Sequence, residues 1–258
     1  MGIDQRIDMK MFMKTKTEIE EITETGVIMS VSYQRLAVES LTPAAHVVID
    51  TDSREDQPGL QYLRPILGKN FRVTLNYNGI VTHVSGLEKI IMDITSEIDS
   101  TKAAVQPYKN TLSDAFGVEN IKNNLEYISP YYPDYKVSAG DEWTYEKVSK
   151  TAQFEFQLIN VSSIKDLTPN NVIIQTNSAI STAENTTLQI DGMDATISMK
   201  GNQVAEMNAD PSTGIVKNGV IKQSIIGDLI LDMQDQGIEN LKVPMKITTD
   251  IEVEIITD

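Results

Sequence analysis

The stretch IDQRIDMKMFMK, residues 3–14, alternates apolar and polar side chains almost without interruption. Such a period of two is typical of a half-buried β-strand, because successive side chains point to opposite faces of a sheet. Phe12 is the one apolar residue on the polar side, and the apolar side carries Ile3, Ile7, Met9, Met11 and Met13. The segment therefore predicts a long strand with a methionine-rich face turned toward a core.

The rest of the chain shows the same preference for strands. Its 258 residues include 31 isoleucines and 19 valines but only 15 leucines, and β-branched side chains suit pleated sheets better than helices. We expect a strand over residues 27–39, a tight hairpin closed by Asn78-Gly79, and several strands over 136–258 with a compact turn at 210–214. These patterns predict a mainly β (α+β) fold, a strongly curved antiparallel sheet or half-barrel of roughly ten strands.

The periodicity changes between the two blocks of strands. Apolar residues recur every three or four positions at Leu87, Ile90, Ile91, Ile94 and Ile98, which predicts an amphipathic helix. Further helical segments are expected over residues 108–116 and 121–128. We therefore expect a single domain, 1–258, in which N-terminal strands (1–85) and C-terminal strands (136–258) wrap a helical insertion (86–129). The alternative is two β-subdomains joined by the helical segment.

Charge and cysteine content limit the chemistry that the chain supports. A net charge of -15 disfavours nucleic acids and anionic headgroups as partners. Without cysteine there are no disulfides, thiolate ligands or thiol nucleophiles. The two histidines, His46 and His83, lie far apart, and no nucleophile elbow, phosphate loop or dinucleotide fingerprint occurs. We therefore expect neither an enzyme, nor a cofactor, nor a metal site.

The acidic stretch from Asp50 to Gly59 is the nearest approach to a metal-binding motif. A calcium loop needs alternating oxygen ligands and a sharp glycine turn, but Arg54 occupies one ligand position and Glu55 stands in place of the glycine. The stretch is therefore interpreted as a solvated surface loop, with adventitious cation binding as the alternative.

The methionines leave two interpretations open. Met9, Met11, Met13 and Met29 share the apolar faces of the first two predicted strands, and flexible thioethers suit a cavity that adapts to varied apolar ligands. In that case the helix residues Leu87, Ile91 and Ile94 complete the lining of the cavity. The same residues also fill ordinary cores, and a measured internal volume separates the two interpretations.

A series of short motifs runs in order through the chain: LGKNF (67–71), VSGLE (84–88), FG (116–117), GDEW (140–143), DPSTG (210–214) and VPMKI (243–247). With the methionine-rich first strand, they resemble a family of uncharacterised secreted lipoproteins of Bacteroidetes. The most specific motif contains Gly140, Asp141 and Trp143, and it is interpreted as structural. Glycine suits a turn, aspartate bonds nearby amides, and tryptophan starts a strand with a buried ring.

The resemblance has implications for fold and location. Such proteins are similar in layout to lipoprotein-carrier half-barrels, in which a curved antiparallel sheet wraps around helices. The family's members are exported and anchored by a lipidated cysteine near the mature N-terminus. Met1-Gly2 leads directly into the first predicted strand, so the sequence is expected to start after the export signal. The resemblance thus implies a protein of the periplasm or cell surface, lipid-anchored to the outer membrane.

Two functional hypotheses follow from these observations. The first is a non-enzymatic envelope lipoprotein that binds a lipid, a lipoprotein or another apolar ligand between sheet and helices. The second is a structural or partner-binding surface lipoprotein whose core is packed in the ordinary way and whose function lies on exposed loops.

Overall fold

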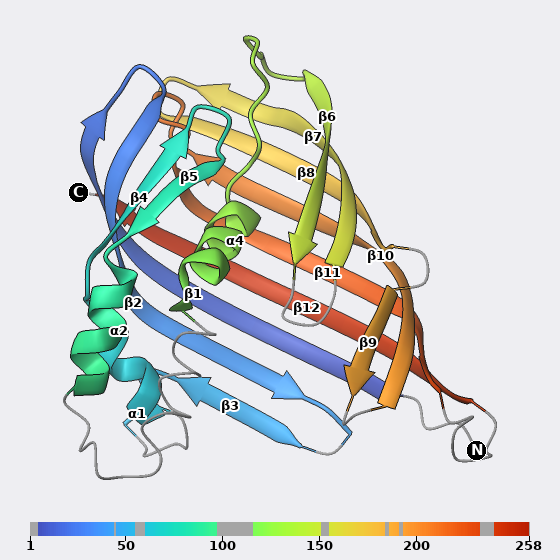
Figure 1. Cartoon of the computed structure of the whole chain (residues 1–258). Coiled ribbons are helices and arrows are strands. Elements are labelled where there is room, and N and C mark those ends of the chain that lie inside the picture. Colours follow the sequence, from blue (N-terminus) through green and yellow to red (C-terminus); the bar gives the residue numbers. More distant parts are fainter. Residues whose placement is uncertain are drawn as a thin grey trace.

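The computed structural model describes residues 5–43, 45–54, 60–96, 116–150, 155–183, 186–190, 193–232 and 240–257. Within these ranges the chain is mostly β and forms one large, curved, open sheet of 12 strands (Figure 1). The strands are β1 (Gln5–Ile22), β2 (Gly26–Leu41), β3 (His46–Asp50), β4 (Phe71–Asn76), β5 (Val81–Ser85), β6 (Glu142–Lys150), β7 (Glu155–Thr168), β8 (Asn171–Thr182), β9 (Thr186–Ile190), β10 (Met193–Ala209), β11 (Val216–Leu231) and β12 (Leu241–Thr257). The predicted fold class is therefore confirmed.

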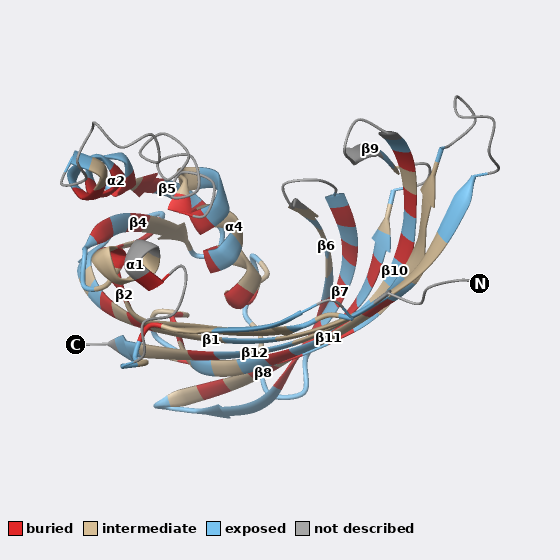
Figure 2. Ribbon diagram, turned by 90° about the horizontal axis from the view of Figure 1, so that it is seen from below, coloured by how far each residue is buried: buried red, intermediate tan, exposed pale blue. Residues whose placement is uncertain are grey.

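The helices gather on the concave side of the sheet. They are the short α1 (Leu60–Leu63) with a 3-10 turn (Arg64–Ile66), α2 (Leu87–Ser96) and α4 (Val118–Ile128). Figure 2 shows α2 and α4 on this inner side, above a sheet whose ends curl upward. Both helices lie in the predicted insertion, whereas the helix predicted over 108–116 falls almost entirely outside the described residues.

The sheet joins the first and last strands of the chain at its centre. Its order is β5-β4-β2-β1-β12-β11-β10-β8-β7-β6, with β3 added to β2 and β9 added to β10. The pairing of β1 with β12 is parallel, while the other described pairs are antiparallel, so the sheet is mixed. Strand periodicity predicts faces but not partners, so the parallel pair does not follow from the local pattern.

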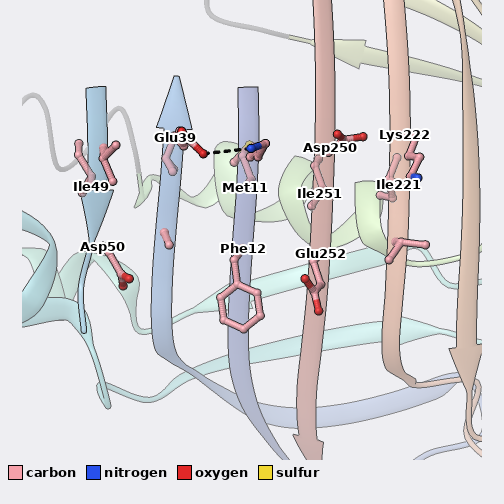
Figure 3. Close-up of a pocket in the computed structure, with 15 residues that line it drawn as sticks. Met11, Phe12, Glu39, Ile49, Asp50, Ile221, Lys222, Asp250, Ile251 and Glu252 are labelled. Carbon is pink, nitrogen blue, oxygen red and sulfur yellow. Dashed lines mark hydrogen bonds and ion pairs between the residues drawn. The ribbon is translucent and has the colours of Figure 1, made fainter. Parts of the chain in front are cut away.

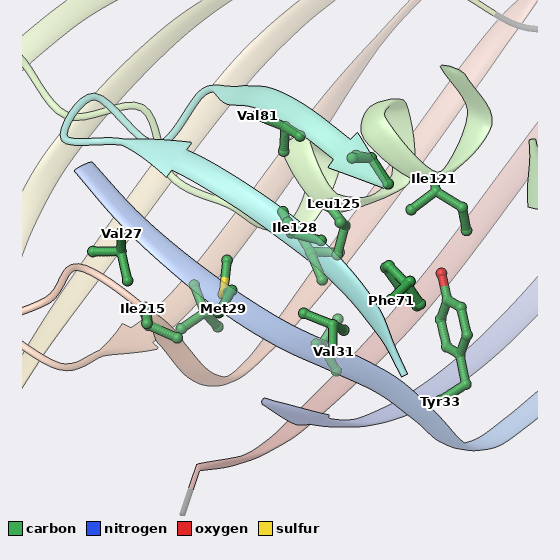
Figure 4. Packing of buried hydrophobic residues seen from close by; sticks show 14 of the residues in the cluster. Val27, Met29, Val31, Tyr33, Phe71, Val81, Ile121, Leu125, Ile128 and Ile215 are labelled. Atoms are coloured by element: carbon green, nitrogen blue, oxygen red, sulfur yellow. The ribbon is translucent and has the colours of Figure 1, made fainter. Parts of the chain in front are cut away.

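Alternating side chains divide each strand between an inner and an outer face. On β1 the odd-numbered Thr15 and Thr17 are buried, so the odd residues face the helices and the even ones face outward. The main core lies between this inner face and the helices, with Leu87, Ile90, Ile91 and Ile94 from α2. From α4 it includes Ile121, Leu125 and Ile128 (Figure 4). Three- and four-residue spacing places these apolar residues on one stripe of each helix.

Two predicted turns connect the strands as expected. The β4–β5 hairpin turns at Asn78-Gly79 with a φ of 81° at Gly79, and Gly214 ends the β10–β11 turn with a φ of 73°. Positive φ is accessible to glycine because it has no Cβ. By contrast, residues 196–200 and 203–208, which resemble two strands in the sequence, belong to the single strand β10. Gly201 makes no turn there, and it lies against the Ser224 carbonyl of β11.

The β10–β11 turn is stabilised by Asp210. Its Oδ1 accepts hydrogen bonds from the amides of Ser212 (2.9 Å) and Thr213 (3.2 Å), and Lys217 Nζ lies 3.3 Å from Oδ2. The Ser212 hydroxyl and amide and the nearby Lys217 and Thr213 lower the pKa of Asp210 from 3.8 to about 2, against the opposing effect of burial. The ionised carboxylate therefore favours the folded state.

Replacing Asp210 by asparagine tests this contribution. Asparagine keeps an acceptor for the turn amides but loses the charge, so Asp210→Asn should lower the free energy of unfolding at pH 7 by about 1 kcal/mol, after allowance for solvent screening. A depressed pKa in the folded state contributes stability that is present above the unfolded pKa. The difference between the two proteins should therefore shrink as the pH falls from 3.8 to about 2. Urea titrations at several pH values measure it, and a difference independent of pH contradicts the assignment.

Candidate functional site

Most of the predicted ligand-lining residues lie together in the main core. Met29, Leu87, Ile91 and Ile94 are buried in it, and Met13 packs against it. The cavity between β1, β2 and α4 measures about 50 Å³ and is lined by residues such as Met29, Leu125 and Ile128. Small-molecule pockets usually measure about 300–1,000 Å³. Side chains therefore fill the space between the sheet and α4.

The other two predicted lining residues lie farther along β1. Met9 and Met11 are on the same inner face as Met13, opposite Thr249 and Ile251 of β12. Neither belongs to the main core, and Met11 is 38% exposed. The seven predicted residues therefore form two groups, one packed under the helices and one left partly open.

A polar row, three of whose four residues are buried, crosses the inner face beside the main core. Asn160, Ser178, Gln203 and Gln223 are opposite one another in the register of β7, β8, β10 and β11. Tyr127 of α4 donates to Gln203 Oε1 at 2.5 Å, and Ser178 donates to Asn160 Oδ1 at 2.6 Å. On the far side of the row lies a second apolar cluster of Phe156, Leu158, Ile180, Ile197, Met199 and Ile225. Because buried polar groups need partners, the row fixes how α4 sits on the sheet.

Glu126 of α4 links the two edge strands β5 and β6. Its Oε1 accepts a hydrogen bond from the Val81 amide of β5 at 3.1 Å, and its carbonyl accepts one from Lys147 Nζ of β6 at 2.7 Å. Burial lowers the pKa of Lys147 to about 8, and the Glu126 carboxylate, 4.0 Å away, partly opposes this shift. A pocket of about 280 Å³ adjoins Lys147. The carboxylate of Glu126 binds β5 and its carbonyl binds β6. We therefore interpret the contacts of Glu126 with Val81 and Lys147 as a structural link between the two edge strands.

The GDxW motif, residues 140–143, spans the turn before β6 and the first residues of that strand. Gly140 has a φ of 90°, and the Asp141 carboxylate accepts a hydrogen bond from the Ser138 amide at 2.8 Å. Trp143 is buried and donates its ring N–H to the Tyr131 carbonyl at 2.8 Å. These contacts hold a turn and the segment between α4 and β6, and they include no reacting group.

The outer face of the sheet carries a hollow of about 470 Å³, which we call the outer trough (Figure 3). Five adjacent strands, β3, β2, β1, β12 and β11, each contribute two outward-facing residues to it, and α4 lies behind the sheet in this view. These ten residues form two cross-strand rows, Val48-Glu39-Lys10-Asp250-Lys222 and Asp50-Ala37-Phe12-Glu252-Val220. The intervening inward-facing residues, such as Met11, border the trough through the main chain.

The outer trough combines apolar surface with fixed charges. Lys10 forms an ion pair with Glu39 at 3.3 Å, and Arg35 forms one with Asp50 at 2.8 Å. The Arg35 guanidinium also lies 5.1 Å from the centroid of the Phe12 ring. Hydrogen bonding by Arg35 lowers the pKa of Asp50 and hydrogen bonding by His46 lowers that of Glu39, so both carboxylates stay ionised. A surface of this kind can bind a partner with both apolar and charged groups.

The local pattern gave one hint of this surface. Phe12 interrupts the polar side of the first strand, and it lies in the middle of the outer trough. The other trough residues come from strands up to 240 positions apart, so no motif brings them together in the sequence. The half-buried lysine at position 147 has no sequence signature either.

The described ranges hold no cluster suited to a metal ion, since no three His, Cys, Asp or Glu side chains meet there in such an arrangement. Residues 55–59 of the predicted acidic loop lie outside these ranges. His46 lies 3.0 Å from the Glu39 carboxylate at the surface. None of the described helices has the length and apolar character needed to cross a membrane.

Comparison with known proteins gives a family. The sequence model of a family of unknown function, DUF6263, matches residues 24–216, which is most of the chain. No curated protein and no solved structure matches.

Proposed function

This chain belongs to DUF6263, a family of unknown function, and we propose that it is a non-enzymatic cell-envelope protein that binds a protein partner on its surface. One observation carries the proposal. The cavity between sheet and α4 holds about 50 Å³, which leaves no room for an acyl chain, whereas the outer trough measures about 470 Å³. In this proposal the curved sheet is a rigid scaffold, and the partner binds on its outer face.

Attachment to the envelope through an N-terminal lipid is part of the same proposal. Its support is the resemblance of the short motifs to those of secreted Bacteroidetes lipoproteins. A lipid anchor would hold so acidic a protein at a membrane without any basic patch. Metabolic labelling of the natural gene product with a radioactive fatty acid, followed by membrane fractionation, tests it. Label in the outer-membrane fraction is expected, and an unlabelled soluble product contradicts it.

Native mass spectrometry tests the absence of an enclosed ligand. Protein extracted from the membranes of its own host with a mild detergent, and freed of that detergent in the spectrometer, should have the mass of the polypeptide and its anchor alone. A stoichiometric apolar ligand, retained in the native spectrum and extractable with organic solvent, would contradict the partner-binding proposal.

A second candidate function is the binding of an apolar ligand at another place on the inner face, outside the main core. Met9 and Met11 lie on the inner face outside the main core, and Met11 is 38% exposed. An apolar ligand would then lie along β1 rather than beneath α4. A dansylated fatty acid should bind saturably in this case, and Met11→Glu should abolish binding while Val220→Glu, on the outer face, should not. Equal binding by both variants rules this candidate out.

A further inference from the structure

The outer trough continues beyond β11. A second hollow of about 350 Å³ lies over β12, β11, β10 and β8, and it shares Val220 and Glu252 with the outer trough. Together they span seven neighbouring strands. With strands about 4.8 Å apart, the path across the sheet is about 29 Å long, which matches an extended segment of about nine residues. A compact ligand would leave most of this length empty.

The charges along this path are unbalanced. Five carboxylates border the two hollows, against the ammonium groups of Lys10 and Lys222. Glu39 and Asp50 already have basic partners, as described above. Glu206, Asp250 and Glu252 make no ion pair or hydrogen bond with any other described side chain. Unpaired carboxylates on a strip with an apolar floor favour a basic occupant and repel phosphates.

One buried acceptor on this path lacks a donor within the described parts of the chain. Asn208 Oδ1 on β10 is buried and has no hydrogen-bond partner among these residues. Asn208 lines the second hollow, opposite Asn218 of β11 and two residues beyond Glu206 on β10. A buried acceptor without a partner costs about 1–3 kcal/mol, and such groups usually require an explanation. Because this atom is closed to solvent, an N–H group of a bound segment would reach it only when the Asn208 side chain turns toward the hollow.

We propose that the two hollows of the outer face dock one extended basic segment of a partner protein, with lysine or arginine side chains on Glu206, Asp250 and Glu252 and apolar side chains on Phe12 and Val220. This inference rests on the proposed function, because it names the chemistry of the partner. An extended chain presents every second residue to one side, so a segment in which basic and apolar residues alternate among those positions, as in Lys-x-Leu-x-Lys, meets both the carboxylates and the apolar floor. A metal ion fits less well, since no three carboxylates converge within the described parts of the chain.

The test uses a fluorescein-labelled peptide of nine residues, (Lys-Ser-Leu-Ser)2-Lys, which presents lysine and leucine to the same side when extended, and fluorescence anisotropy with the whole protein. Binding should saturate and should not occur with (Glu-Ser-Leu-Ser)2-Glu. Glu206→Gln/Glu252→Gln should weaken it about fivefold or more, because each exposed ion pair contributes up to about 1 kcal/mol. The control Glu88→Gln/Glu119→Gln removes the same charge from the first turns of α2 and α4 and should leave the affinity unchanged.

Every outcome of the anisotropy experiment either supports or overturns the proposal. Absence of saturable binding, or equal weakening by both double variants, overturns it, since the second result shows only long-range attraction by an acidic protein. Matching thermal unfolding midpoints show that the variants are folded. If peptide binding fails while the native spectrum shows no enclosed ligand, the inference about the partner falls and the proposed function stands. A retained apolar ligand removes the proposed function instead.

Discussion

Replacing Ile121 by alanine is expected to lower the free energy of unfolding by about 3–4 kcal/mol, the usual cost of emptying a fully buried isoleucine site. Ile121 is 0% exposed and lies on the side of α4 that packs into the main core (Figure 4). The packing is tight there, with a neighbouring cavity of only about 50 Å³, so the new void cannot collapse without moving the helix.

A matched substitution on the outer face gives the control. Ile159 on β7 is 52% exposed, and Ile159→Ala should change the free energy of unfolding by less than about 0.5 kcal/mol. Urea denaturation followed by circular dichroism measures both variants. A loss below about 1 kcal/mol for Ile121→Ala would mean that α4 does not rest on a filled core.

Replacing Gly79 by alanine is expected to cost about 3 kcal/mol, made up of a backbone cost and a steric cost. The φ of 81° is unfavourable for an L-residue, and an added Cβ would lie 2.3 Å from the Pro130 carbonyl oxygen. The hairpin turn would have to separate from the segment after α4, which it now contacts through the Asn78 and Tyr132 main chains at 3.0 Å.

A matched substitution at Gly140 measures the backbone cost without the steric cost. It has a φ of 90°, but nothing lies within 4 Å of the position that a Cβ would occupy, so Gly140→Ala should lose only about 1–2 kcal/mol. Thermal unfolding of the two variants side by side measures the difference. Equal losses would show that the hairpin is not seated against residue 130.

Local patterns in the sequence predict much of this fold. The alternation around Met9, Met11 and Met13 gives β1, Asn78-Gly79 gives the hairpin turn, and the three- and four-residue spacing from Leu87 gives α2. Each of these is decided by neighbours within a few positions, which is the range over which periodicity and turn chemistry act. The parallel pairing of β1 with β12 joins residues 240 positions apart, and no local pattern encodes it.

The candidate surfaces are harder to predict for the same reason. Asn160, Ser178 and Gln203 each look like an isolated polar exception on an apolar face, and only the register of three strands shows that they form one row. The outer trough likewise needs five strands in the correct order. The sequence also leaves the methionine face open to both a ligand cavity and a core, because composition does not determine how much space the helices fill.

Photo-crosslinking from two adjacent residues of β1 tests the central claim most directly. Met11 points to the inner face and Phe12 to the outer trough. Benzoylphenylalanine is placed at either position in the protein expressed in its host, and the cells are irradiated. Docking on the outer face predicts a discrete crosslinked polypeptide from position 12 and none from position 11. Crosslinking to lipid or to a polypeptide from position 11, with none from position 12, would contradict it.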